Sequence, residues 1–211
     1  FNDDEQIKLA PKILELHFKH EGGNKEEILK YFENLAQLSA QARQSLEVLA
    51  QVHAIAGDPA KSAEILLRLV RVPFIIEDLP HWLLLCELYV NKLDQAAKAE
   101  ELLWSLFANF PEKVEIFNKL DATYTSREER RIFVENIKTH VNDGEVFKQK
   151  PDLARQYLGF AAQILGSELG IWKEAQDLYS EAIDKAEIPQ PELGCLTLQC
   201  LLPERTCKAV I

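Results

Sequence analysis

The residues best placed for metal chemistry are His17 and His20, which stand three positions apart and are followed by Glu21. On one helix this spacing brings both imidazoles to the same face, where they could reach a metal ion together. Two such histidines also occur together by chance, and a histidine near the C-terminal end of a helix interacts favourably with the helix dipole. We therefore expect exposed helix-end histidines and no metal site.

The cysteines offer a second possible metal or disulfide site. Cys86 lies in an apolar segment, whereas Cys195, Cys200 and Cys207 have the spacing C-x4-C-x6-C with no histidine nearby. This spacing differs from the short C-x2-4-C pairs of most structural zinc sites. A secreted disulfide scaffold would be shorter and richer in cysteine. We expect free thiols, with Cys86 as a packed, unreactive side chain.

Catalytic signatures are missing from the sequence. It contains no G-x-S-x-G, H-E-x-x-H, P-loop or G-x-G-x-x-G pattern. The carboxylate pairs Glu26-Glu27, Glu100-Glu101 and Glu128-Glu129 are adjacent, so the two side chains of each pair point in different directions on a helix. His81 precedes Cys86 by five positions and does not share a helix face with it. We expect a protein that is not an enzyme and needs no cofactor.

Composition limits the partners. The 24 Lys and Arg residues face 34 Asp and Glu residues, and the net charge of -10 repels the phosphate backbone of nucleic acids. The most apolar run, His81 to Val90, is far shorter than the ~20 residues that a membrane span requires. We expect neither a nucleic-acid partner nor a membrane span.

The start of the sequence bears on its origin. It opens with Phe1-Asn2-Asp3, contains no methionine and has no basic segment followed by an apolar one. These features suggest an internal fragment or a processed chain. We expect a cytoplasmic protein, or a periplasmic one if an upstream signal peptide has been removed.

The elements that would position these residues are helices, because apolar residues recur at spacings of three and four and strand patterns are missing. Glycines, prolines and capping residues mark the breaks, and Ser126 with Glu129 forms the S-x-x-E capping box of a helix start. The predicted helices are Asp4 to His20, Lys25 to Leu38, Ala40 to Ala56, Pro59 to Arg71, Leu79 to Lys92, Asp94 to Asn109, Glu112 to Tyr124, Arg127 to Val141, Asp152 to Leu165 and Ile171 to Glu187.

These helices form pairs in which similar residues recur. The first helices align at four positions, i, i+3, i+4 and i+7. The second helices share a small residue followed by larger ones four and seven positions later. Small residues let two helices approach closely, and large ones fill the groove to the next pair. The first-helix sets are Leu46, Leu49, Ala50 and His53; Trp82, Leu85, Cys86 and Tyr89; and Leu158, Ala161, Ala162 and Leu165. The second-helix sets are Ser62, Leu66 and Leu69; Ala99, Leu103 and Leu106; and Ala175, Tyr179 and Ala182.

The period between Leu46 and Trp82 is 36 residues, and one residue is inserted before Ala99. His53 stands where Tyr89 stands in the next pair, so we expect it to be a packed, hydrogen-bonded core histidine.

At these positions the sequence resembles the tetratricopeptide repeat (TPR). The residues that carry the resemblance are Trp82, Leu85, Tyr89, Ala99, Leu103 and Pro111, the turn Gly57-Asp58, and Gly170, Trp172, Ala175, Tyr179 and Ala182. The unit from Glu112 to Val141 departs from the pattern, with Asp121 where a small residue is usual. The run Arg130 to Glu135 is similar to the half-TPR repeat of RNA-processing scaffolds, which remains an alternative.

The resemblance implies an all-α fold, a right-handed superhelical stack of antiparallel helical hairpins, or α-solenoid. It covers about Ala40 to Glu187. We expect an N-terminal hairpin over 1–39, TPR-like repeats over 40–188, and a capping or interface tail over 189–211.

The resemblance also implies where a ligand would lie, because the first helices of such hairpins line the concave face that takes peptides or partner proteins. Carrying the repeat positions over gives candidate ligand-binding residues, and a solvated face without a partner remains the alternative for each of them. These residues are Gln44, Glu47, Gln51, Leu83, Glu87, Asn91, Asn118 and Gln163.

This lining is acidic and rich in amides, which favours a peptide or protein with Lys or Arg. Members of the family that grip the acidic tail of heat-shock chaperones use Lys, Asn and Arg at positions that carry Glu47, Gln51, Leu83 and Glu87 here, which argues against a chaperone tail. We expect a non-enzymatic protein-interaction scaffold in a larger assembly. The alternatives are an RNA-processing scaffold and a periplasmic scaffold of bacterial envelope export.

Overall fold

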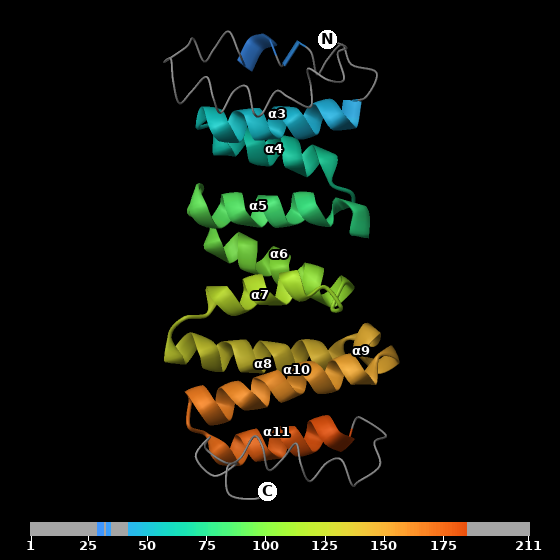
Figure 1. The fold of residues 1–211 in the computed structure, drawn as a ribbon, viewed down its shortest axis with the longest axis vertical. Helices are drawn as coiled ribbons and strands as arrows, with labels where there is room; N and C mark the ends of the chain where they lie inside the picture. Colours follow the sequence, from blue (N-terminus) through green and yellow to red (C-terminus); the bar gives the residue numbers. More distant parts are fainter. Residues whose placement is uncertain (1–28, 32, 35–41, 185–211) are drawn as a thin grey trace, which may run out of the picture. The chain divides into compact units, whose positions relative to one another are not determined.

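The structure is a computed structural model that describes residues 29–31, 33–34 and 42–184. Every secondary-structure element within these ranges is helical, as the residue spacing predicts (Figure 1). The chain divides into two compact units, with the boundary between Leu103 and Trp104. The predicted domain boundaries at 39/40 and 188/189 lie outside the described residues.

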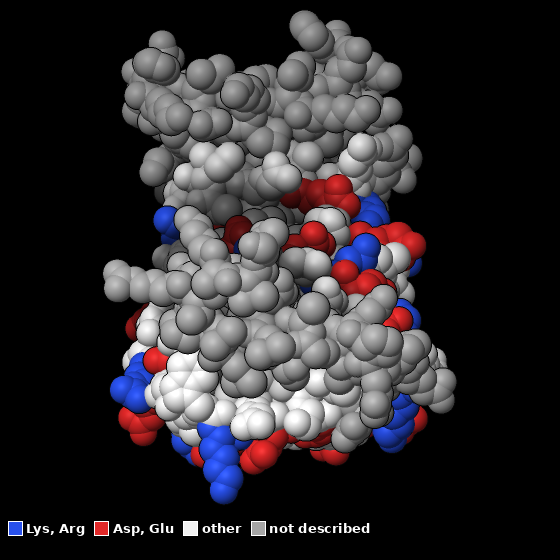
Figure 2. All heavy atoms as spheres, turned by 60° about the horizontal axis from the view of Figure 1, so that its bottom comes forward, with Lys and Arg blue, Asp and Glu red and all other residues white. Residues whose placement is uncertain are grey.

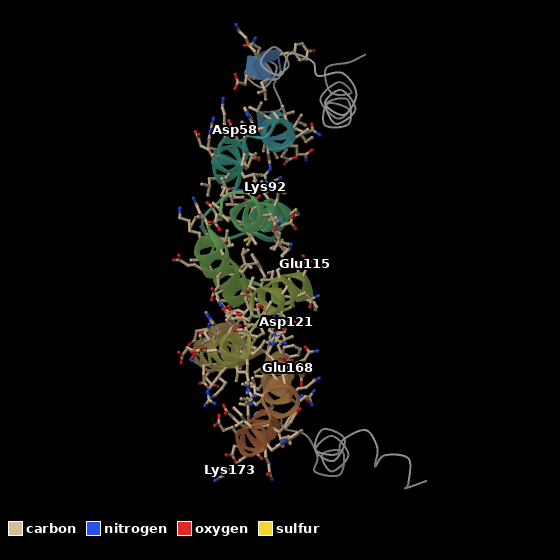
Figure 3. The ribbon with its side chains drawn as sticks, turned by 90° about the vertical axis from the view of Figure 1, so that its left-hand side faces the viewer. Asp58, Lys92, Glu115, Asp121, Glu168 and Lys173 are labelled. Carbon is tan, nitrogen blue, oxygen red and sulfur yellow. The ribbon has the colours of Figure 1, made fainter. Side chains whose placement is uncertain are left out.

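The first unit contains α3 (Ala42–Ala56), α4 (Pro59–Leu69), a 3-10 turn η1 (Ile76–Asp78), α5 (Leu79–Asn91) and the start of α6 (Ala96–Asn109). Helix α3 packs against α4, and α4 packs against α5. In Figure 3, α3 and α5 lie on one side of this unit and α4 on the other. The unit is therefore built of two layers, one of first helices and one of second helices.

The second unit contains the end of α6, α7 (Val114–Thr123), α8 (Arg127–Asp143), the short α9 (Glu145–Gln149), α10 (Pro151–Gln163), a π-helical turn η2 (Ile164–Glu168) and α11 (Trp172–Asp184). Helix α10 packs against both α8 and α11. Within this unit, α7 and α10 lie on one side and α8 and α11 on the other (Figure 3).

The helices predicted from Ala40 onward are confirmed, with ends that differ by a few residues. The predicted capping box is also confirmed, because the Ser126 hydroxyl accepts a hydrogen bond from the Glu129 amide and the Glu129 carboxylate accepts one from the Ser126 amide. The sequence pattern did not predict the short elements η1 and α9 or the π-helical form of η2. The helix predicted over Asp4 to His20 lies outside the described residues.

Turns at matching places end the first helices of three hairpins. Gly57, Asp94 and Gly170 have positive φ values of 88°, 53° and 73°. Gly57 lets α3 end in a left-handed residue, and Asp58 then caps α4 by accepting a hydrogen bond from the Lys61 amide. Because Gly57 and Asp94 lie 37 positions apart, the turn recurs at the 36-residue period plus the inserted residue. The repeat is therefore visible in the backbone as well as in the side chains.

Small residues hold the helices of the first two hairpins close together. The Ser62 hydroxyl on α4 donates a 2.7 Å hydrogen bond to the carbonyl oxygen of Ala50 on α3. In the next hairpin the Cys86 thiol on α5 lies 3.9 Å from the carbonyl oxygen of Ala99 on α6. These four residues are buried and occupy the repeat positions predicted for close approach.

The last hairpin accommodates one extra residue differently. The Leu169 amide bonds to the Ile164 carbonyl at 3.1 Å, within the π-helical turn η2 that continues α10. A π turn contains one more residue than an α turn. The inserted residue is therefore taken up within η2, and α11 does not have to slide along α10 to accommodate it. Gly166 in this turn packs against Trp172, and a Cβ at Gly166 would lie 3.0 Å from the indole ring.

Aromatic rings fill the core of the second unit. The Phe107 and Phe117 rings lie 5.8 Å apart, and each contacts the Tyr157 ring, at 4.9 Å and 4.7 Å. The Trp104 indole stacks on His140 and donates a 2.8 Å hydrogen bond to the Tyr124 hydroxyl. This core holds α7, α8 and α10 together although the Glu112 to Val141 unit departs from the repeat pattern.

Candidate functional site

The eight candidate ligand-binding residues are divided between the two units. Gln44, Glu47 and Gln51 lie on α3, and Leu83, Glu87 and Asn91 lie on α5, all in the first unit. Asn118 on α7 and Gln163 on α10 belong to the second unit. The candidate site is therefore the set of six residues on α3 and α5, with two further exposed amides on the first helices of the second unit.

Exposure along α3 and α5 follows the 36-residue period. Gln51 and its repeat equivalent Glu87 are both exposed, and Glu47 and its equivalent Leu83 are both half-buried. The same alignment places the buried Ala50 and Cys86 at equivalent positions. Asn91, Asn118 and Gln163 are exposed and Gln44 is half-buried. The two helices thus carry polar side chains at equivalent positions, and both helices lie on the same side of the unit (Figure 3).

Glu47 is engaged within the unit. Its carboxylate lies 3.5 Å from the Arg43 guanidinium on the same helix and 3.2 Å from the His81 Nε2 on α5. The Arg43 guanidinium therefore offsets part of its charge, and the His81 ring lies beside it. Of the two acidic candidates, Glu87 is the more exposed.

A buried carboxylate organises the end of this face. Asp78, which precedes α5, is fully buried, and its oxygens accept hydrogen bonds from the side chains of Arg43 and Arg71 and from the Arg71 amide. Burial raises the pKa of Asp78, but these hydrogen bonds outweigh it and bring the pKa from 3.8 to about 2. Asp78 is therefore charged near neutral pH and fixes the start of α5 against α3.

His53 is packed as predicted, but the predicted hydrogen bond is wrong. The ring is 1% exposed, and neither nitrogen makes a hydrogen bond within the described part of the chain. Its Nε2 lies 3.6 Å from the Glu33 carboxylate, which instead accepts a hydrogen bond from Lys61. Burial lowers the pKa of His53, and the Lys61 ammonium lowers it further. The distance from Nε2 to the Glu33 oxygen therefore lies just outside the range of a hydrogen bond.

The remaining candidates from the sequence are placed as follows. Cys86 is buried and forms no disulfide within the described residues, as predicted. Among the described residues, no group of three or more His, Cys, Asp or Glu side chains could hold a metal ion. No helix in the same residues has the length and apolar character to cross a bilayer. His17, His20, Glu21 and the three cysteines after Asp184 lie outside the described residues.

Arginines at the start of α8 also find partners inside their unit. Arg130 bonds the Glu168 carboxylate through two nitrogens, at 2.7 and 2.9 Å, and it also pairs with Asp121. Arg131 lies 3.4 Å from Glu174. The run that resembles a half-TPR repeat thus joins α7, α8, η2 and α11. Asp121, which departs from the TPR pattern, is the partner of Arg130.

A groove between α10 and α11 was not expected from the sequence. It has a volume of about 440 Å³, and its lining includes Arg155, Gln156 and Gly159 from α10 and Tyr179 and Ala182 from α11. A Cβ added at Gly159 would meet no atom within 4 Å, so the groove is open at that position. On the face shown in Figure 2, acidic and basic side chains of the described residues are interspersed.

No protein-family model, curated protein sequence or solved structure matches this chain.

Proposed function

We propose that the chain is a non-enzymatic scaffold of TPR-like hairpins that binds a peptide or partner protein through its first helices, as part of a larger assembly. The observation that carries the proposal is the periodic exposure of polar residues on α3 and α5. Gln51 and Glu87 are exposed at equivalent positions, one residue after the buried Ala50 and Cys86. A surface that repeats with the fold suits an extended ligand, because each hairpin offers it the same kind of contact.

The chemistry of this face favours a ligand with a basic residue and a free backbone. Glu87 can pair with Lys or Arg, and the Gln51 and Asn91 amides can bond to peptide N–H and C=O groups. Glu47 is also in contact with Arg43 and His81. Glu87 is the more exposed of the two carboxylates and is therefore the one that the experiment below tests.

The ion pairs of α8 weigh against the alternative of an RNA-processing scaffold. Arg130 is bonded to Glu168 and Asp121, and Arg131 lies beside Glu174. Arginines held by carboxylates offer little net positive charge to a phosphate backbone. Their contacts support a role in holding the hairpins of the second unit together.

The test is selection of random 12-residue peptides displayed on phage against the full chain, followed by affinity measurement with the enriched peptides. We expect enrichment of Lys or Arg at a fixed position. In Glu87→Lys the affinity should fall about 5- to 30-fold, the effect expected when an attractive charge contact of about 1 to 2 kcal/mol is reversed.

Glu64→Lys on α4 is the matched control, since it makes the same charge change at an exposed position of a second helix. Its affinity for the peptides should stay within twofold of the parent chain. Peptides without basic residues that bind all three proteins equally would place the binding surface elsewhere and reject the proposal.

A further inference from the structure

The groove between α10 and α11 has an equivalent in the first unit, where the same surface of α3 and α4 is covered by the segment that follows α4. The repeat alignment that matches Ala162 with Ala50 also matches Arg155 with Arg43 and Gly159 with Glu47. On the second helices it matches Tyr179 with Leu66 and Ala182 with Leu69. The lining of the groove is thus the counterpart of the surface that α3 and α4 present to the segment after α4.

In the first unit that segment is η1 and the start of α5. Arg43 pairs with Asp78, and its Nη1 also donates a hydrogen bond to the Leu69 carbonyl oxygen at 3.5 Å. Glu47 lies 3.2 Å from His81. Leu79 and Trp82 are buried in the same segment. An acidic residue followed by apolar residues therefore fills the groove beside an arginine.

The sequence after α11 carries the same order of residues. Glu192 and Leu193 correspond to Asp78 and Leu79, and the same alignment matches Leu196 with Trp82 and Cys200 with Cys86. Gln199 departs from the pattern, since it matches the buried Leu85.

The connecting chain has the required length. Asp78 follows Leu69 by nine positions, and Glu192 follows Ala182 by ten. The segment can therefore reach the groove as η1 and α5 reach theirs.

We propose that residues 192–202 of this chain occupy the groove between α10 and α11, with Glu192 paired to Arg155 and Cys195 beside Gly159. The apolar residues of the segment cover Tyr179 and Ala182. The pairing follows the first unit, where Arg43 pairs with both Glu47 on its own helix and Asp78 from the next segment, and Arg155 likewise lies 3.5 Å from Asp152 on its own helix. The proposal does not depend on what α3 and α5 bind.

Cross-linking in the full chain tests this register. The variant Gly159→Cys, combined with Cys200→Ser and Cys207→Ser, leaves Cys195 as the partner thiol near the groove. Under mild oxidation at micromolar protein we expect an intramolecular disulfide between the introduced thiol and Cys195, identified by peptide mapping. Lys173→Cys, with Gly159 retained and the same two serine substitutions, is the control, because Lys173 lies at the start of α11, away from Tyr179 and Ala182 along the helix, and is also exposed.

The Gly159→Cys chain should form the intramolecular disulfide at least about tenfold faster than the Lys173→Cys chain, since a docked segment has an effective concentration on the order of millimolar. A disulfide between two chains, increasing with protein concentration, would instead assign the groove to a second copy and overturn the proposal. Equal and slow reaction of both variants would also overturn it.

Charge reversal provides an independent check on the pairing. In the Gly159→Cys background, Arg155→Glu and Glu192→Arg should each slow disulfide formation about two- to fivefold, the range for a partly exposed ion pair. Combining them should restore the rate. Rates unchanged by all three variants would overturn the proposed register, and circular dichroism would verify that each variant retains its helices.

Discussion

Arg43 on α3 and Asp78 at the start of α5 form an ion pair in which the carboxylate is fully buried and the guanidinium remains partly exposed. The two residues lie 35 positions apart, so the pair joins consecutive hairpins. Asp78 also holds the connection between α4 and α5, because the Arg71 amide donates a hydrogen bond to its carboxylate at 3.0 Å. One carboxylate therefore fixes both the path of the chain after α4 and the docking of α5 on α3.

Replacing Asp78 should show how much this connection stabilises the fold. We expect Asp78→Asn to lower the free energy of unfolding by about 1.5 to 3 kcal/mol at pH 7, because it removes the charge-assisted hydrogen bonds that Arg43 and Arg71 donate to the buried carboxylate. Urea unfolding followed by circular dichroism measures this. Glu77→Gln is the control at the neighbouring exposed carboxylate and should change the value by less than about 0.5 kcal/mol.

The pH dependence of the Asp78 contribution follows from its depressed pKa. A carboxyl group whose pKa is about 2 in the folded chain stabilises the fold fully above its ordinary value of 3.8, and loses this contribution as the pH falls through 2. The difference in unfolding free energy between the parent chain and Asp78→Asn should therefore shrink between pH 4 and pH 2. A constant difference over this range would contradict the ion-pair explanation.

His53 should behave as an unfavourable polar group in the core. We expect His53→Leu to raise the free energy of unfolding by about 1 kcal/mol at pH 7, because it removes a buried ring that lacks hydrogen bonds. Leucine suits this position, since Leu165 occupies the equivalent place after α10 and is buried there. Urea unfolding provides the measurement.

The same variant should alter stability below neutral pH. Because the pKa of His53 is lowered in the folded chain, the unfolded chain takes up the proton first as the pH falls below about 6.5, and stability is lost there. His53→Leu should reduce the loss of stability between pH 7 and pH 5. An identical pH dependence in both proteins would show that His53 is not responsible.

Arg130 and Arg131 form a matched pair for testing the role of α8. The Arg130 side chain is 14% exposed and bonds two carboxylates, whereas the Arg131 side chain is 52% exposed. The hydrogen bonds to Glu168 and Asp121 raise the pKa of Arg130. Arg130→Lys should cost about 1 to 2 kcal/mol, since an ammonium cannot reproduce the fork geometry.

Arg131→Lys should cost less than about 0.5 kcal/mol, the value for an exposed pair. Thermal unfolding of both variants in low and high salt distinguishes the two cases. Equal costs for the two substitutions would indicate that the bonds of Arg130 are not a principal contact between α7, α8 and η2.

Two glycines near each other on α10 and η2 should respond in opposite directions to alanine. A Cβ at Gly166 would lie 3.0 and 3.2 Å from the Trp172 ring and 3.6 Å from the Ala175 Cβ, so Gly166→Ala should destabilise the chain by about 1 to 3 kcal/mol. Gly159→Ala replaces a helical glycine whose added Cβ would meet no described atom within 4 Å, and it should stabilise the chain by about 0.5 to 1 kcal/mol. Urea unfolding of both variants checks the signs, and a shared sign would contradict the packing described for η2.

Much of the fold could be predicted from the sequence because its determinants are local. The Gly57-Asp58 turn and the Ser126 capping box each depend on residues within one or two helical turns, and both are observed. The small residues Ser62 and Ala99 predicted close helix pairs, and both lie at close contacts.

Contacts between residues far apart in the sequence could not be predicted. Nothing local indicates that Asp78 meets Arg43, that Glu33 meets Lys61, or that His53 makes no hydrogen bond within the described residues. The same limit applies to the candidate site, where Glu47 lies beside His81 on another helix. Exposure of Gln51 and Glu87 was predictable, because it follows from the helical period alone.

The π-helical turn at Ile164–Glu168 has a consequence for how such hairpins can vary in length. It confines one additional residue to a single turn that contains Gly166 and lies before the left-handed Gly170. In the second hairpin the additional residue falls in the connection that contains Asp94, between α5 and α6. The length of a hairpin can therefore change by one residue in two ways, by widening the last turn of the first helix or by lengthening the connection between the two helices.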